Sequence, residues 1–250
     1  MNIEWKAKEY TNNFSFVHNY GESVMELLDV PTGAKVIDLG CGNGALTQKL
    51  AEKGYEVIGM DASQDMLQIA RQKHPALTFI QADATKKIPS EPVEGIFSNA
   101  VFHWINDQQA LFANVAKTLK PGGQLVFEMG GAECAATVHN ALRQCFTKRG
   151  LPYAYSFYFP TIGEYAPIVE AHDLRITYAT WFRRPTEQQT GEQGLADWIK
   201  MFVREAFKIV DAEQAEDIIA EAEEICRPKL YKAGKWYIDY TRLRMKAVKQ

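Results

Sequence analysis

The stretch VIDLGCGNGALTQKL, residues 36–50, constrains the fold of this chain more than any other. Its short apolar residues predict a buried strand over 34–40, and its later residues predict a helix over 45–54. Three glycines, at positions 40, 42 and 44, lie between the two. A strand that enters a helix through glycines presents backbone N–H groups to a ligand, because glycine allows close approach and unusual dihedral angles. The turn therefore predicts a nucleotide site.

Strand and helix patterns alternate through the first half of the chain. Further strands are predicted over 55–61, 77–83, 95–101 and 124–130, and the remaining helices over 14–29, 63–74 and 107–120. Residues 121–123, PGG, are expected to form a turn. Strands separated by helices predict an α/β fold with a parallel, doubly wound sheet.

The second half is less regular, and no linker divides it from the first, so we expect one domain over 1–250. Helices are predicted over 135–150, up to 172 and between 193 and 226, and strands over 174–182 and 237–249. An aromatic stretch over 152–165 has two interpretations: an edge strand that covers the core, or an aromatic wall for a substrate.

Composition limits the function classes. The 250 residues carry a net charge of −3, with a pI near 6.0, so nucleic acid is an unexpected partner. The four cysteines are scattered without the spacing of a metal or disulfide framework, so we expect no metal and a reducing compartment. No signal-peptide pattern or long apolar run occurs, which predicts a cytoplasmic protein without a membrane span.

Asp38 separates two interpretations of the glycine turn. Gly40, Gly42 and Ala45 fit a dinucleotide fingerprint, with Asp61 roughly 20 residues further on for the ribose. A carboxylate at the end of the first strand would repel a pyrophosphate, yet it suits an ammonium or sulfonium group. S-adenosylmethionine carries both groups. A nicotinamide-dependent oxidoreductase remains the enzymatic alternative, and a non-catalytic module that binds S-adenosylmethionine is the third possibility.

Five segments, in this order and spacing, resemble the motif series of class I S-adenosylmethionine-dependent methyltransferases. They are VIDLGCGNG (36–44), GMDAS (59–63), QADAT (81–85), SNAVFHW (98–104) and LKPGGQLVFEMG (119–130). The chain is most similar to bacterial small-molecule methyltransferases of the trans-aconitate type. The resemblance implies a Rossmann-like sheet with an antiparallel last strand. It also implies a cofactor core over about 30–130 and a helical and aromatic lid from insertions at about 131–160 and 183–229.

The resemblance assigns one group of residues to the methionyl end of the cofactor. Gly40, Cys41 and Gly42 would surround this part, and Asp38 would lie near its amino group. Asn99 would offer a backbone carbonyl to the same ammonium. The cofactor implied is S-adenosylmethionine.

A second group is assigned to the nucleoside end. Asp61 would accept hydrogen bonds from the ribose hydroxyls. Ala62 and Met66 would flank the adenine, and Asp83 with Ala84 would meet its exocyclic amine.

The expected activity is methyl transfer to a small molecule, at a carboxylate or hydroxyl oxygen or at a nitrogen. A carboxylate is already a nucleophile, whereas a hydroxyl or amine must lose a proton. His103 is the first candidate for a general base, followed by His18 and Tyr20. We expect the protein to act as a monomer or homodimer.

Substrate contacts are expected from the segments outside the sheet. Arg143, Arg183 and Arg184 could hold a carboxylate, whereas Trp198 and Tyr158 suit a flat or lipophilic acceptor. Tyr20 is expected on the same side. The sequence leaves both kinds of acceptor open.

Overall fold

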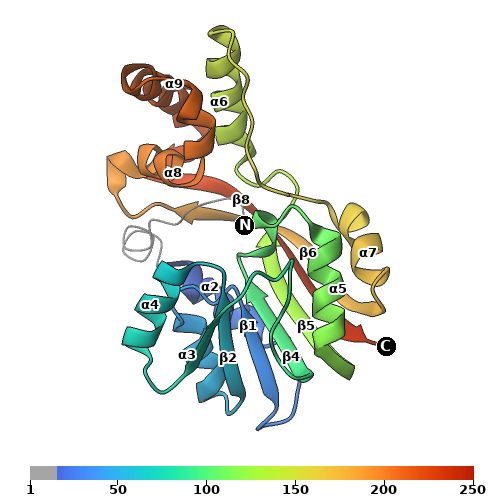
Figure 1. Ribbon diagram of the computed structural model, residues 1–250. Helices are drawn as coiled ribbons and strands as arrows, with labels where there is room; N and C mark the ends of the chain where they lie inside the picture. Colours follow the sequence, from blue (N-terminus) through green and yellow to red (C-terminus); the bar gives the residue numbers. More distant parts are fainter. Residues whose placement is uncertain (1–15) are drawn as a thin grey trace.

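The computed structural model describes residues 16–250, with side chains from Gly21 onward. Within this range the strands form one sheet in the order β3-β2-β1-β4-β5-β8-β6, and β7 pairs with β8 (Figure 1). The strands are β1 (Lys35–Leu39), β2 (Glu56–Asp61), β3 (Thr78–Gln81), β4 (Val93–Asn99), β5 (Leu119–Gly130), β6 (Leu174–Glu187), β7 (Tyr231–Lys232) and β8 (Lys235–Lys249).

The pairing confirms the expected α/β fold. β1 to β5 pair in parallel, whereas β8 is antiparallel to β5 on one side and to β6 on the other. The sheet is therefore mostly parallel and its last strand is antiparallel. Parallel neighbours end at the same edge of the sheet, so the turns that follow β1, β2 and β4 meet there.

Helices cover both faces of the sheet, as a doubly wound fold requires. On one face α2 and α3 pack around Val24, Leu50 and Phe97. On the other face α5 and α7 pack around Phe112 and Tyr165. The helices in this half are α2 (Phe16–Met25), α3 (Ala45–Glu52), α4 (Gln64–Lys73), the short η1 (Phe102–Trp104), α5 (Gln108–Thr118) and α7 (Ile162–Glu170).

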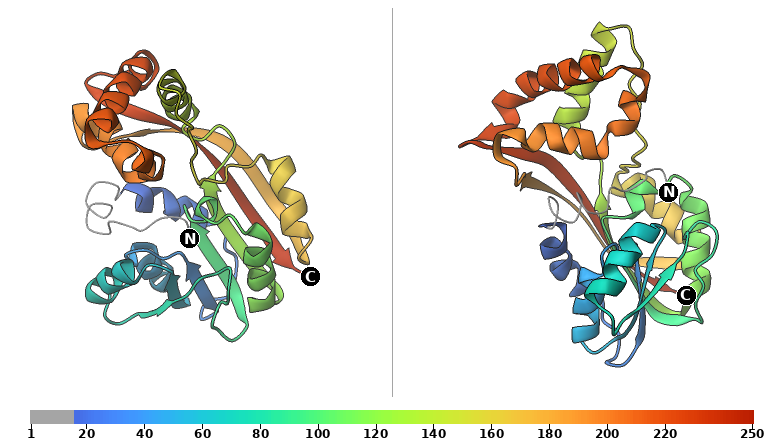
Figure 2. Two further views of the ribbon diagram at one scale, coloured as in Figure 1. Left: turned by 45° about the horizontal axis from the view of Figure 1, so that its top comes forward. Right: turned by 60° about the vertical axis from the view of Figure 1, so that its left-hand side comes forward.

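A second group of helices lies beyond the carboxyl edge of the sheet, and we call it the helical layer (Figures 1 and 2). It has its own apolar core, which includes Phe146, Trp198, Ile218 and Trp236. Its members are α6 (Ala136–Lys148), η2 (Gly191–Gln193), α8 (Gly194–Phe202), η3 (Arg204–Ile209) and α9 (Ala212–Leu230).

Two strands join the sheet to the helical layer. The pairing of β8 with β5 ends at Arg242 and Gly130, but its pairing with β6 continues to Tyr237 and Glu187. Both strands are therefore longer than predicted, and their outer halves form a two-stranded ribbon that reaches the helical layer (Figure 2).

Two local predictions were wrong. The aromatic stretch forms no strand between 151 and 161, so it is not an edge strand. The PGG segment at 121–123 belongs to β5, which begins at Leu119 and shifts its register against β4 between Val93 and Gly95. By contrast, Ser63 caps α4 as its position predicts, because its hydroxyl accepts the backbone N–H of Met66.

Trp236 tests how much the helical layer contributes to stability. It is fully buried, and its indole N–H donates to the backbone carbonyl of Glu192 at 2.8 Å. Trp236→Ala should lower the free energy of unfolding by about 3–5 kcal/mol, because it removes a large buried ring. Tyr178→Ala, on the exposed side of β6, is the control and should change it by less than about 0.5 kcal/mol. Urea unfolding measures both, and equal effects would contradict the prediction.

Candidate active site

A cavity opens at the carboxyl ends of β1, β2 and β4, with a volume of about 930 Å³ that includes its open mouth. All ten residues expected to bind the cofactor line it. They are Asp38, Gly40, Cys41, Gly42, Asp61, Ala62, Met66, Asp83, Ala84 and Asn99. The other lining residues were not predicted from the sequence; they are Leu39, Leu46, Met60, Ala82, Ala100, Val101, Trp104 and Ile105. Most lie at a strand end or just after one, whereas Leu46 belongs to α3 and Trp104 to η1, so closeness in sequence to the expected residues was the available signal.

Asp38 is a buried carboxylate at the end of β1. Its side chain accepts a hydrogen bond from the hydroxyl of Thr47 at 2.7 Å, and only 2% of the residue is exposed. Burial, opposed by the Thr47 hydrogen bond and aided by the nearby charge of Asp61, raises the pKa of Asp38 to about 7. A positively charged ligand at this position would relieve that cost.

Asp61 fixes the glycine turn from the neighbouring strand. One carboxylate oxygen accepts the backbone N–H of Gly42 at 2.9 Å, and the other accepts that of Ser63 at 2.8 Å. Burial raises the pKa of Asp61, against the effect of these hydrogen bonds. Asp61 thus connects the turn after β1 to the start of α4.

The glycine turn is shaped by contacts that only glycine permits. Gly40 has a φ of +79°, and a Cβ there would lie 2.2 Å from a methyl carbon of Val101. Gly42 has a φ of +54°, yet nothing lies within 4 Å of its Cβ position, so its surface is open to a ligand. The turn is therefore closely packed on one side and accessible on the other.

Asp83 lies in the turn after β3 and lines the same cavity. Partial burial acts to raise its pKa, but hydrogen bonds from the hydroxyl and backbone N–H of Thr85 outweigh this, so its pKa is lowered. Asp83 is ionised at neutral pH and can accept hydrogen bonds from a ligand.

His103 does not line the cavity, although the next residue, Trp104, does. The ring is buried, and its Nδ1 accepts the backbone N–H of Gly130 at 3.2 Å. Burial and the charge of Arg242 lower the pKa of His103 to about 3. The ring is therefore neutral, and the Gly130 hydrogen bond assigns its proton to Nε2.

The residues expected to contact the substrate do not converge. Arg143 donates to Asn140 at 2.7 Å on α6, and Arg183 is largely exposed beside Glu133. Trp198 is buried in the helical layer. Tyr158 packs against Tyr165 on the far face of the sheet, and Arg184 is paired with Glu128. The side chains of His18 and Tyr20 lie outside the described residues.

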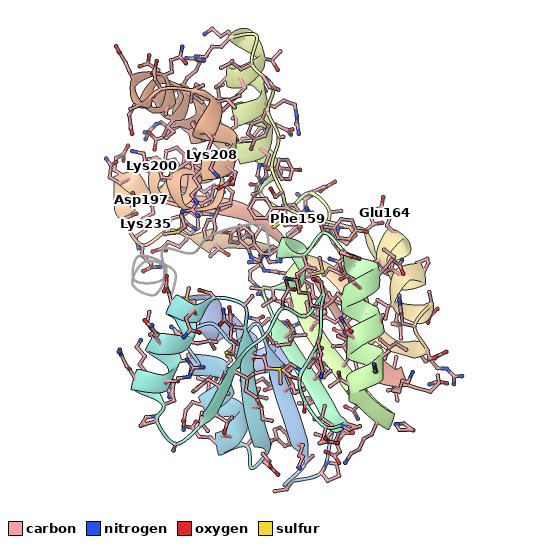
Figure 3. The ribbon with its side chains drawn as sticks, in the orientation of Figure 1. Phe159, Glu164, Asp197, Lys200, Lys208 and Lys235 are labelled. Atoms are coloured by element: carbon pink, nitrogen blue, oxygen red, sulfur yellow. The ribbon has the colours of Figure 1, made fainter. Side chains whose placement is uncertain are left out.

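An aromatic row leads from the cavity towards the helical layer. The ring centroid of Trp104 lies 4.5 Å from that of Phe157, which stacks on Phe159 at 5.0 Å. Figure 3 shows Phe159 between the sheet and the helical layer. His139 continues the row, with its ring 5.7 Å from Phe157 and its Nδ1 2.7 Å from the hydroxyl of Tyr153.

Across residues 16–250, no group of three or more His, Cys, Asp or Glu side chains is arranged to hold a metal ion. In the same range, none of the helices combines the length and the apolar character that crossing a bilayer requires.

Comparisons with known proteins agree with this geometry. A family model described as a methyltransferase domain matches residues 37–127. An uncharacterised methyltransferase of Schizosaccharomyces pombe is 28% identical over 98% of both chains. Trans-aconitate 2-methyltransferase of an Azoarcus species is 34% identical, but the match spans only half of each chain.

Solved structures show the same fold. A methyltransferase structure from Bacillus halodurans aligns with a TM-score of 0.65 at 14% identity, covering 91% of this chain and 97% of the other. A phosphoethanolamine N-methyltransferase of Haemonchus contortus, solved with S-adenosylmethionine, aligns with a TM-score of 0.55 at 20% identity, covering 92% and 52%. The sheet order, the motif series and these relatives support a class I S-adenosylmethionine-dependent methyltransferase.

Proposed function

We propose that this enzyme methylates an oxygen atom of a small-molecule acceptor, and that the atom belongs to a carboxylate. One observation supports the choice. Among the described residues, the cavity has no His, Lys or Tyr in its lining, and its apolar end is formed by Val101, Trp104 and Ile105. An alcohol or amine acceptor needs a group that takes its proton, whereas a carboxylate does not.

The cavity residues fit S-adenosylmethionine, which supplies a methyl group activated by a sulfonium. Asp38 and the carbonyl of Asn99 would hold the ammonium, and the open surface of Gly42 would lie along the methionyl chain. Asp61 retains lone pairs for the ribose hydroxyls while it holds the turn. Asp83 would accept a hydrogen bond from the exocyclic amine of the adenine.

The other lining residues would orient the acceptor and exclude water. In-line displacement needs the nucleophile, the methyl carbon and the sulfur to be collinear, so positioning is the main task of the protein. Trp104 and the aromatic row that follows it offer a rigid wall for the acceptor. The helical layer would close over this wall as a lid.

The alternative enzyme class is not favoured. A nicotinamide cofactor carries a pyrophosphate, and the buried carboxylate of Asp38 would oppose that charge. A hydroxyl acceptor remains the second candidate function, because Tyr20 and His18 lie outside the described side chains.

The function is tested by supplying acceptors together with S-adenosylmethionine and detecting S-adenosylhomocysteine and the methylated product by mass spectrometry. The acceptors should include trans-aconitate, because the name of a relative includes it.

With a carboxylate acceptor, His103→Ala should lower kcat by about tenfold or less, and the rate should be independent of pH above the acceptor pKa of about 4. His103→Asn is the control, because its side-chain oxygen can still accept the N–H of Gly130. A loss of 10²-fold or more in both variants, with a basic limb near pH 6–7, would instead indicate a base and a hydroxyl or amine acceptor.

The affinity for S-adenosylhomocysteine tests the role of Asp61. Asp61→Ala should weaken binding by roughly 1.5–3 kcal/mol, because the ribose loses a charged hydrogen-bond partner and Gly42 loses its restraint. Asp65→Ala is the matched control, because it removes the same charge from an exposed position on α4. Calorimetry measures both, and equal dissociation constants for Asp61→Ala and the wild type would refute the role.

Asp38 predicts a pH dependence of stability for the cofactor-free protein. Its pKa rises from 3.8 in the unfolded chain to about 7 in the fold, so folding is linked to proton uptake between these values. The contribution of Asp38 to the free energy of unfolding is fully present below about pH 4 and is lost as the pH rises to about 7. The Tm of the wild type relative to Asp38→Asn should therefore fall from pH 5 to pH 7.5. A difference between the wild type and Asp38→Asn that stays constant over this pH range would contradict the prediction.

A further inference from the structure

Three arginines share a single carboxylate beside the cavity. Glu128 on β5 is 2% exposed and receives two hydrogen bonds from Arg184, at 2.5 and 3.0 Å. Arg244 on β8 donates twice more to one Glu128 oxygen, at 2.8 and 2.6 Å, and also to Ser23. These two arginines already neutralise Glu128, and Arg242 brings a further positive charge to the same cluster.

Arg242 is the arginine of this cluster that has guanidinium N–H groups without a hydrogen-bond partner. Its Nε is 3.7 Å from Glu128, beyond hydrogen-bond distance. Its Nη1 donates to the carbonyl of Thr241 at 3.2 Å and contacts the sulfur of Cys134 at 3.5 Å. Within residues 16–250, its Nη2 has no hydrogen-bond partner.

Glu128 is the counter-charge nearest to Arg242, and Arg184 and Arg244 share it. The Arg242 side chain retains only 11% of its exposure, and its guanidinium lies over the ring of Tyr240 at 4.3 Å. Asp239 is close in sequence, but its carboxylate accepts the backbone N–H of Thr137 and makes no ion pair with Arg242 among the described residues. The N–H groups of Arg242 that have no described partner are therefore available to an anionic ligand.

Arg242 is not among the residues that line the cavity, but the sheet register places it near the carboxyl end of β4, where the cavity opens. Asn99, which lines the cavity, pairs with Glu128, and Gly130 pairs with Arg242. Arg242 therefore lies opposite the residue two positions after Glu128, closer to the carboxyl edge of the sheet. Its strand, β8, is two strand spacings from β4, which is about 10 Å. Its charge also reaches His103, whose pKa it lowers.

The side chains in question share one face of the sheet. Phe97 and Val126, two residues before Asn99 and Glu128, belong to the core beneath α2 and α3. Successive side chains alternate between faces, so Asn99 and Glu128 project from this face too. The contact of Arg242 with Glu128 puts its guanidinium there as well.

We propose that Arg242 binds a carboxylate of the methyl acceptor and positions it beside the methyl group, a role that rests on the proposed function above. Nη2 carries two N–H groups that no described residue accepts, and they can donate to a carboxylate. An acceptor oxygen lone pair forms the new O–CH₃ bond, the C–S bond breaks, and sulfur keeps its electron pair. No proton moves in this step.

The Tyr240 ring under Arg242 connects this position to the helical layer. The hydroxyl of Tyr240 accepts the indole N–H of Trp198 on α8. Arg242 is therefore supported by the sheet through Glu128 and by the helical layer through Tyr240. A bound carboxylate would contact a residue that both parts of the molecule hold in place.

The test compares Arg242→Gln and Arg242→Lys with the exposed Arg175→Gln as a control for charge. The probes are trans-aconitate, citrate, fumarate and benzoate, measured in steady-state turnover and, with S-adenosylhomocysteine bound, in calorimetry. Arg242→Gln should raise KM for an accepted carboxylate by about 30-fold or more, the range for loss of a buried charge partner. The KM of Arg242→Lys should lie between those of the wild type and Arg242→Gln, because lysine keeps the charge but lacks the planar guanidinium. Cofactor affinity and Tm should stay close to those of Arg175→Gln.

Distinct results would overturn distinct claims. An unchanged KM in Arg242→Gln, or turnover confined to uncharged acceptors, would refute the role of Arg242 and leave S-adenosylmethionine-dependent methyl transfer intact. Absence of S-adenosylmethionine binding and of any turnover would refute the proposed function itself. If Arg242→Gln does not fold, the wild type decides: loaded with S-adenosylhomocysteine, it should bind trans-aconitate but not the trimethyl ester, and equal binding of both would overturn the inference.

Discussion

The buried carboxylate of Asp38 and the half-buried carboxylate of Asp61 determine the architecture of this site. Asp38 and Asp61 lie at the ends of neighbouring parallel strands. Burial raises the pKa of both carboxyl groups, and the charge of Asp61 raises that of Asp38 further. The fold supplies partial compensation through the Thr47 hydroxyl and through backbone N–H groups. What remains is a preformed anionic position beside an open glycine surface. The cavity, the turn and the choice of a cationic ligand all follow from it.

Much of the core was predictable because its signals are local. A strand, a glycine turn and a helix occupy consecutive residues, so the position of Gly40 is visible in the sequence, and the close contact with Val101 explains why glycine is required there. Asp38 and Asp61 lie at the ends of their strands and Asp83 just after one, and parallel strands bring their ends together without further information. All the expected cofactor residues were therefore found on one cavity.

The acceptor side could not be predicted in the same way, because it depends on pairing between distant segments. Arg184 was a reasonable candidate for holding a carboxylate, yet Glu128, fifty-six positions earlier, already occupies it. Arg242 looked like an ordinary strand residue until the register of β8 placed it beside Gly130. Likewise His103 was attractive as a base, but the backbone N–H of Gly130 and the surrounding rings leave it neutral and buried.

The place of β8 between β5 and β6 also affects how the chain can fold during its synthesis. β6 ends at Glu187 and β8 begins only at Lys235, so β6 leaves the ribosome well before the strand that joins it to the sheet. Until β8 arrives, the parallel half can form, but β5 keeps an open edge and β6 has no neighbour in the sheet. Unpaired strand edges are the usual starting points of aggregation. The nascent chain is therefore most exposed to misassembly while the helices of 194–230 are being made.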